Sequence, residues 1–126
     1  MILDSCFLID VMTRDQAALA KRDELRDDPR PVGVATPSIT EVERGLGDGA
    51  RLQAFRTIVD DLSVVPFDHR IARTAADVLR TLDDRGEPIG TLDAFVAATA
   101  QVRDEPVVTR NVAEFDRVDG LAVSPY

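Results

Sequence analysis

The fold is indicated first by residues 1–12, which read MILDSCFLIDVM. Met1–Leu3 is a short apolar run that ends at Asp4, which is typical of a buried strand. Four apolar residues then recur at helical spacing, namely Phe7, Leu8, Val11 and Met12. A buried strand that leads directly into a helix begins a strand–helix–strand unit, and here a carboxylate stands at the junction.

The rest of the chain repeats this alternation. Further strands are predicted at Val32–Ala35, Leu62–Pro66, Pro106–Thr109 and, as an edge strand, Leu121–Val123. Helices are predicted over residues 16–26, 36–46, 51–61, 69–84, 92–102 and 112–115, and three of them begin at the capping residues Thr36, Asp68 and Thr91. The pattern predicts one α/β domain in which helices flank a mainly parallel sheet.

Composition narrows the class of protein. The chain has 126 residues, of which 44% are hydrophobic, and this suits one folded domain. Cys6 is the only cysteine, so no disulfide can form within the chain. No apolar stretch approaches the roughly 20 residues of a membrane span, and the N-terminus lacks the regions of a signal peptide. We therefore expect a soluble, cytoplasmic protein.

The net charge is −8, and Lys21 is the single lysine among 15 basic residues. An acidic surface with so little lysine suggests a salt-rich cytoplasm, although a GC-rich genome would also favour arginine. The charge argues against a nucleic-acid binder that relies on a broad basic patch. Any nucleic acid must be held locally, by metal ions and a few arginines.

Three acids stand at the ends of predicted elements. Asp4 follows the first strand, Glu41 lies one turn into the helix that starts at Thr36, and Asp93 lies in the first turn of an alanine-rich helix. Each acid has a structural alternative. Asp4 could cap a helix, Glu41 could be an exposed helix glutamate, and Asp93 could complement a helix dipole.

The three acids together predict a cation site, because ligands of parallel sheets bind beyond the carboxyl ends of the strands. Ligands that are all oxygen suit Mg²⁺ or Mn²⁺. Zinc is disfavoured because Cys6 and His69 are the only soft or imidazole ligands and they lack motif spacing. We expect His69, next to the capping Asp68, to be a surface histidine.

Four pieces of sequence carry a family resemblance. They are LDS at 3–5 with LID at 8–10, SITEVERG at 38–45, IGTLDAFVAATA at 89–100, and VVTRN at 107–111 with EF at 114–115 and VDGL at 118–121. With these pieces in this order, from Ile2 to the C-terminus, the sequence resembles the PIN-domain ribonucleases. The resemblance is strongest to the VapC toxins of toxin–antitoxin pairs.

This resemblance implies a single PIN-like nuclease domain over residues 1–126, a three-layer sandwich with a sheet of four or five strands. Asp4, Glu41 and Asp93 match the first three acids of the family and are the implied metal ligands. The family's fourth acid often falls where this chain has Asn111. Glu114, about one helical turn later, is the candidate for the missing catalytic charge.

The resemblance also implies substrate contacts. Ser5 and Thr109 would be hydroxyls that support a metal ligand or contact a phosphate, and Asn111 would lie with them. Arg110 could hold a substrate phosphate or could be a surface arginine in a salt link. Asp10 is interpreted as structural.

The implied activity is that of a Mg²⁺-dependent endoribonuclease, with Mn²⁺ as an alternative ion. Asp4 and Asp93 would hold the ion, and Glu41 would orient it or accept a proton from water. The products would carry a 5′-phosphate and a 3′-hydroxyl. The implied partners are an RNA substrate, a small antitoxin protein and a second copy of the chain.

Other functions fit the residues less well. A phosphoryl-accepting receiver domain needs a late lysine, but the only lysine is Lys21. A phosphatase of the haloacid dehalogenase type needs a second aspartate where this chain has Cys6, and an isochorismatase-type hydrolase needs a lysine and a later cysteine. Asn111 keeps open a fourth hypothesis, a PIN-like binding protein that is weakly active or inactive and acts with a DNA-binding partner.

Overall fold

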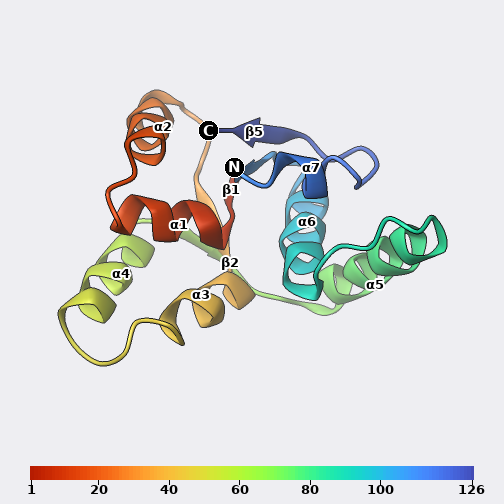
Figure 1. Ribbon diagram of the computed structural model, residues 1–126, viewed down its shortest axis with the longest axis horizontal. Coiled ribbons are helices and arrows are strands. Elements are labelled where there is room, and N and C mark those ends of the chain that lie inside the picture. The colour runs from red at the N-terminus through yellow and green to blue at the C-terminus, as the bar shows by residue number, and fades with distance from the viewer.

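A computed structural model describes all 126 residues and contains one five-stranded sheet (Figure 1). The strands lie in the order β3-β2-β1-β4-β5, and every neighbouring pair is parallel. The strands are β1 (Ile2–Leu3), β2 (Gly33–Ala35), β3 (Ser63–Val65), β4 (Val107–Thr109) and β5 (Val123–Pro125). The helices are α1 (Ser5–Met12), α2 (Gln16–Asp27), α3 (Thr36–Glu43), α4 (Ala50–Asp60), α5 (His69–Asp84), α6 (Thr91–Arg103) and α7 (Val112–Phe115).

The sheet divides the hydrophobic core into two clusters, because successive residues of a strand face opposite sides. Ile2 and Val107 pack with apolar residues of α5 and α6. Leu3, Val34 and Val108 pack with apolar residues of α1, α2, α3 and α4. Figure 1 shows α1 to α4 on one side of the sheet and α5 to α7 on the other. The predicted α/β sandwich with a parallel sheet is confirmed.

Helix α6 is largely buried, and its composition explains why it can be. Its buried residues are small or β-branched, namely Ala94, Val96, Ala97, Ala98, Thr99 and Ala100. Small side chains let the helix lie close to both the sheet and α5. The first turn of α6 then brings Asp93 to the carboxyl edge of the strands.

Two predicted caps are wrong, and one is confirmed. The residue before α3 is Ala35, and the Thr36 hydroxyl instead accepts a hydrogen bond of 3.1 Å from the backbone N–H of Phe67. Helix α6 is preceded by Gly90, with no side-chain cap, and Thr91 is its first residue. Asp68 caps α5 as predicted, because its carboxylate accepts from the backbone N–H of Ile71 at 2.9 Å.

Two elements, α3 and the edge strand, differ from the prediction by more than one residue at a boundary, whereas the other predicted boundaries differ by at most one. Helix α3 ends at Glu43 rather than at residue 46. The edge strand is Val123–Pro125 rather than Leu121–Val123, because its pairing with β4 begins only where Val123 lies opposite Val107. No helix of the structure is both long enough and apolar enough to cross a bilayer.

Candidate active site

The parallel sheet brings the ends of three strands to one edge. Asp4 directly follows β1, and Thr109 is the last residue of β4. Strand β2 leads into α3, which carries Glu41. Helix α6 starts near the same edge and carries Asp93 in its first turn. Residues that are far apart in the sequence therefore meet here because of the strand order.

The Asp4 carboxylate is 1% exposed and is held by three short hydrogen bonds. It accepts from the Ser5 backbone N–H at 2.8 Å, from the Thr109 hydroxyl at 2.8 Å and from the Cys6 thiol at 3.0 Å. Asp4 is also the N-cap of α1, so the structural alternative considered from the sequence is correct. The Ser5 hydroxyl lies at a longer 3.5 Å, and because a carboxylate has about four lone-pair sites, a closer partner could take this fourth position.

Asp93 is surrounded by other acids. Burial raises the pKa of Asp93 to about 7, and a hydrogen bond with the Glu114 carboxyl group and the charges of Asp4, Glu114 and Glu41 add to the increase. Three other acids therefore act on Asp93 in this structure. Asp93 lies in the first turn of α6, as the helix-dipole alternative requires, but its acidic neighbours go beyond that role. Glu41 is half-buried and is therefore not the exposed helix glutamate of the other alternative.

None of these four acids forms an ion pair, although eleven other ion pairs are present in the protein. Bringing four partly buried carboxylates together without a cation costs free energy, because like charges repel strongly in a poorly solvated site. The acids do not close around one point, and no group of three or more His, Cys, Asp or Glu is arranged tightly enough to hold an ion. The all-oxygen donor set and the uncompensated charge nevertheless fit a hard divalent cation.

Arg110 has partners of its own beside the acid cluster. Its guanidinium pairs with Asp15 at 2.9 Å and with Asp10 at 3.5 Å. It also lies 5.2 Å from the centre of the Tyr126 ring, whose hydroxyl donates to Asp10 at 2.8 Å. The Tyr126 ring in turn packs edge-on against Phe7 at 5.0 Å between centroids. The structure thus shows Arg110 in a salt link and Asp10 in a structural role.

The remaining predicted residues fall into two groups. Ser5 and Thr109 are buried beside Asp4, and the Thr109 hydroxyl also accepts from the Asn111 backbone N–H at 3.0 Å. The Asn111 side chain is exposed and makes no capping bond at the start of α7. Glu114, rather than Asn111, is the residue of this segment that reaches Asp93.

Cys6 and His69 are unsuited to act as a nucleophile or as a base. Burial, the Asp4 charge and the hydrogen bond to Asp4 raise the pKa of the Cys6 thiol, so the thiolate that a nucleophile requires is disfavoured. His69 is exposed at the start of α5, as expected of a surface histidine. Sequence reasoning overlooked the hydrogen bond that the Cys6 thiol donates to Asp4 and the contacts of Tyr126 with Cys6 and Asp10 of α1, which no motif or spacing reveals.

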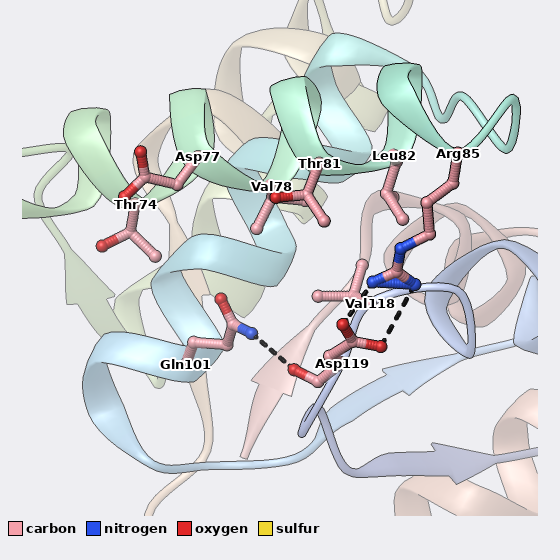
Figure 2. A pocket seen from close by; sticks show the side chains of 9 residues that line it. All are labelled: Thr74, Asp77, Val78, Thr81, Leu82, Arg85, Gln101, Val118 and Asp119. Carbon is pink, nitrogen blue, oxygen red and sulfur yellow. Dashed lines mark hydrogen bonds and ion pairs between the residues drawn. The ribbon is translucent and has the colours of Figure 1, made fainter.

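A different hollow, of about 290 Å³, lies between α5, α6 and the turn after α7 (Figure 2). Its lining arginine, Arg85, is ion-paired with the Asp119 carboxylate, and Gln101 donates to the Asp119 carbonyl oxygen at 3.0 Å. Its other acid, Asp77, pairs with Arg80. The charges of this hollow are therefore satisfied within the protein, in contrast to the cluster around Asp93.

The whole arrangement can be compared with known proteins. Residues 1–121 match the PIN domain. The chain belongs to the PIN domain family. Ribonuclease VapC10 of Mycobacterium tuberculosis is 30% identical over 111 residues, which cover 88% of this chain and 78% of that protein. This PIN domain is therefore of the VapC type, as the sequence resemblance predicted.

Two further comparisons bear on this PIN domain. The tRNA(fMet)-specific endonuclease VapC of Salmonella typhimurium is 27% identical over 84 residues, which cover 67% of this chain but only 64% of that protein. The fold is similar to that in a crystal structure of VapBC2 from Rickettsia felis bound to a DNA fragment from their promoter. That match has a TM-score of 0.84 at 15% identity and covers 99% of this chain and 97% of the other. The predicted three-layer PIN fold is confirmed.

Thr109→Val tests how Asp4 is held in this PIN domain. Valine preserves the shape but removes the hydroxyl that donates to Asp4 and accepts from Asn111. The variant should lose about 1–3 kcal/mol of unfolding free energy, because the N–H of Asn111 and an oxygen of Asp4 each lose a partner. Urea denaturation measures this loss. Thr99→Val is the matched control, since the buried Thr99 hydroxyl donates only to a carbonyl oxygen of its own helix.

The raised pKa of Asp93 predicts how stability depends on pH. Between pH 4 and 7 the folded chain binds a proton at Asp93 that the unfolded chain has released, so this residue favours the folded state at low pH. That contribution is present near pH 4 and is lost as the pH rises through about 7. Carboxyls such as Asp28, whose pKa the hydrogen bonds and charge of Arg30 lower to about 2, act in the opposite direction below pH 4.

Thermal unfolding of the metal-free protein should therefore be followed from pH 4.5 to 8, beside Asp93→Asn. The difference in melting temperature between variant and wild type should grow with pH and level off above 7. A difference that stays constant over this range would contradict the raised pKa.

Proposed function

We propose that this protein is a Mg²⁺-dependent endoribonuclease and the toxin of a type II toxin–antitoxin module. The observation that supports this most is the cluster of Asp4, Glu41, Asp93 and Glu114, which has no protein cation and lies at the carboxyl edge of a PIN fold. The relatives named ribonuclease and endonuclease support the reaction class. Mn²⁺ could replace Mg²⁺, because the all-oxygen donors suit both ions.

Each acid has a proposed part in the site. Asp4 and Asp93 hold the ion, with Glu41 as a third ligand. When bound, the ion supplies a Lewis acid that activates water and polarises the phosphoryl oxygen. Glu41 is half-buried and lines an open hollow, so it is placed to orient a water molecule and accept its proton. Glu114 supplies the fourth charge in place of Asn111.

The neighbouring residues position these acids. Thr109 is fully buried, and both it and Ser5 contact Asp4, so we assign them to holding Asp4 in place. Asn111 and Arg110 are exposed at the same edge, where they can contact RNA. For Arg110 this requires the salt links to Asp10 and Asp15 to open. Direct attack by water on the phosphorus leaves a 5′-phosphate and a 3′-hydroxyl.

Partners follow from the same relatives. The Rickettsia felis structure is of a VapBC assembly on promoter DNA. We propose that this chain likewise forms a complex with a small DNA-binding antitoxin, that it forms a homodimer, and that it acts on RNA in the cytoplasm. A PIN-like binding protein without cleavage activity is the alternative.

The test is cleavage of a defined set of RNAs, including transfer RNA, by the purified chain. We expect no cleavage in EDTA, restored cleavage on addition of excess Mg²⁺ or Mn²⁺, and 5′-phosphorylated products. Calorimetry with the metal alone checks the ion independently of substrate. Divalent binding without cleavage of any RNA would favour the binding-protein alternative, and full activity in EDTA would overturn the mechanism.

A further inference from the structure

We propose that a hollow beside Glu41 is a nucleotide subsite, in which Arg44 binds a backbone phosphate and Phe67 stacks on a base. The inference rests on the proposed ribonuclease function and identifies where the substrate strand leaves the acid cluster. The hollow has a volume of about 350 Å³, within the range of about 300–1,000 Å³ usual for ligand sites. It lies between one face of α3 with the following Arg44, the start of α6 and the residues before α5.

The hollow is continuous with the reaction centre. Glu41 lines it, and the charge of the same carboxylate acts on Asp93. Leu92, which also lines it, is the residue before Asp93. The hollow is the space next to the Glu41 carboxylate, so it offers a path for a strand of RNA whose scissile phosphate lies at the acids.

The free cation of this region is Arg44. It follows α3 directly, three residues after Glu41, and its exposed guanidinium makes no ion pair or hydrogen bond within the protein. Arg110, the arginine expected from the sequence, is instead paired with Asp10 and Asp15. In a protein of net charge −8, an unpaired guanidinium beside a cluster of acids offers a specific contact for a phosphate.

The opposite wall of the hollow is apolar. Phe67 and Leu92 form it. The Phe67 ring packs against the Phe95 ring, with centroids 4.6 Å apart and planes inclined by 52°. The Thr36 hydroxyl accepts from the Phe67 backbone N–H, which fixes this residue against α3. A rigid aromatic ring beside a cation is the combination by which proteins bind single-stranded nucleic acid.

The exposed Thr40 lines the hollow one turn before Arg44, and its hydroxyl can both donate and accept. This matches the 2′-hydroxyl of a ribose, which distinguishes RNA from DNA. The site therefore fits one ribonucleotide of an unpaired strand.

The first experiment compares Arg44→Ala with Arg51→Ala in steady-state cleavage of a single-stranded RNA. Arg51 is an exposed arginine of α4 that also lacks an ion pair and does not line the hollow. For Arg44→Ala we expect KM to rise about tenfold with kcat within about twofold of wild type. The salt dependence of log kcat/KM should also become shallower by about 0.7, the value for one lost phosphate contact on a single strand. Arg51→Ala should match wild type.

The second experiment uses Phe67→Leu, which keeps an apolar side chain in the core, and RNAs that carry 2-aminopurine at successive positions around the scissile bond. Wild type should quench the fluorescence at one position next to the cleaved bond, and Phe67→Leu should restore it. Thermal unfolding of each variant separates a loss of stacking from a loss of fold.

The outcomes distinguish this inference from the proposed function. If wild type cleaves RNA but Arg44→Ala keeps its KM and salt dependence, or no position is quenched, the subsite is wrong and the ribonuclease stands. If wild type with Mg²⁺ neither cleaves RNA nor binds it, the proposed function itself fails, and the subsite fails with it.

Discussion

Asp93→Asn should reduce RNA cleavage by about a thousandfold or more and, in the same protein, raise the stability of the metal-free fold. The loss of cleavage follows from the removal of a carboxylate that we propose as a ligand of the ion, whose stabilisation of the transition state would be worth several kcal/mol. The gain in stability follows first from the burial of the Asp93 carboxylate, and then from the repulsion that it experiences from Asp4, Glu114 and Glu41. After allowance for screening by water, we expect roughly 1–2 kcal/mol at pH 8.

The two effects are measured separately, by single-turnover cleavage with excess Mg²⁺ and by urea denaturation in EDTA. Asp83→Asn is the matched control, since Asp83 is an exposed aspartate of α5 without an ion pair and should change neither quantity. A variant that is inactive and also less stable than wild type would show that Asp93 is primarily a structural residue. A variant that retains activity would remove it from the site.

Asp4→Asn should also abolish cleavage but should change stability in the opposite direction. The Asp4 carboxylate accepts from the Ser5 N–H, the Thr109 hydroxyl and the Cys6 thiol, and all three are donors. An amide in this position must present its NH₂ group to at least one donor. We expect the free energy of unfolding to fall by about 2–3 kcal/mol, because hydrogen bonds to a charged group are lost.

Urea denaturation in EDTA measures this effect, and circular dichroism at low temperature checks that the variant is folded before cleavage is assayed. Asp4→Asn should lower the free energy of unfolding, whereas Asp93→Asn should raise it. Together these opposite changes test how the two carboxylates are held. The Asp4 carboxylate has three hydrogen-bond donors within the protein, whereas the Asp93 carboxylate is surrounded by other acids and has no cationic partner there. Equal effects of the two substitutions on stability would contradict this division.

Much of the fold could be predicted from the sequence, because its strands are short apolar runs and its helices carry clear periodicity. The strand–helix junction at Asp4 was located correctly, as was the buried, alanine-rich helix that carries Asp93. Capping was less predictable. Thr36 has the sequence of an N-cap, but its hydroxyl bonds to Phe67, 31 residues away. A capping rule that considers only neighbouring residues cannot anticipate a hydrogen-bond partner so distant in the sequence.

The candidate site could be predicted only in part, because it too depends on contacts between residues distant in the sequence. The identity of the acids is local, but the contact between Asp93 and Glu114 depends on the packing of α6 against the end of β4. The sequence also offered no way to choose between a free and a paired Arg110. That choice depends on Asp10, Asp15 and Tyr126, which lie on α1, just before α2 and just after β5.

The order of the strands has a consequence for how the protein folds during synthesis. The central strand β1 is made first, yet one of its neighbours is β4, and the Asp4–Thr109 hydrogen bond spans 105 positions. Such long-range parallel pairing is slow to form and raises the contact order of the fold. A chain still on the ribosome carries Asp4 without Thr109 or Glu114 until residues 109–114 have been translated. The contacts of Asp4 and Asp93 described above therefore cannot all form until this late segment has joined the sheet.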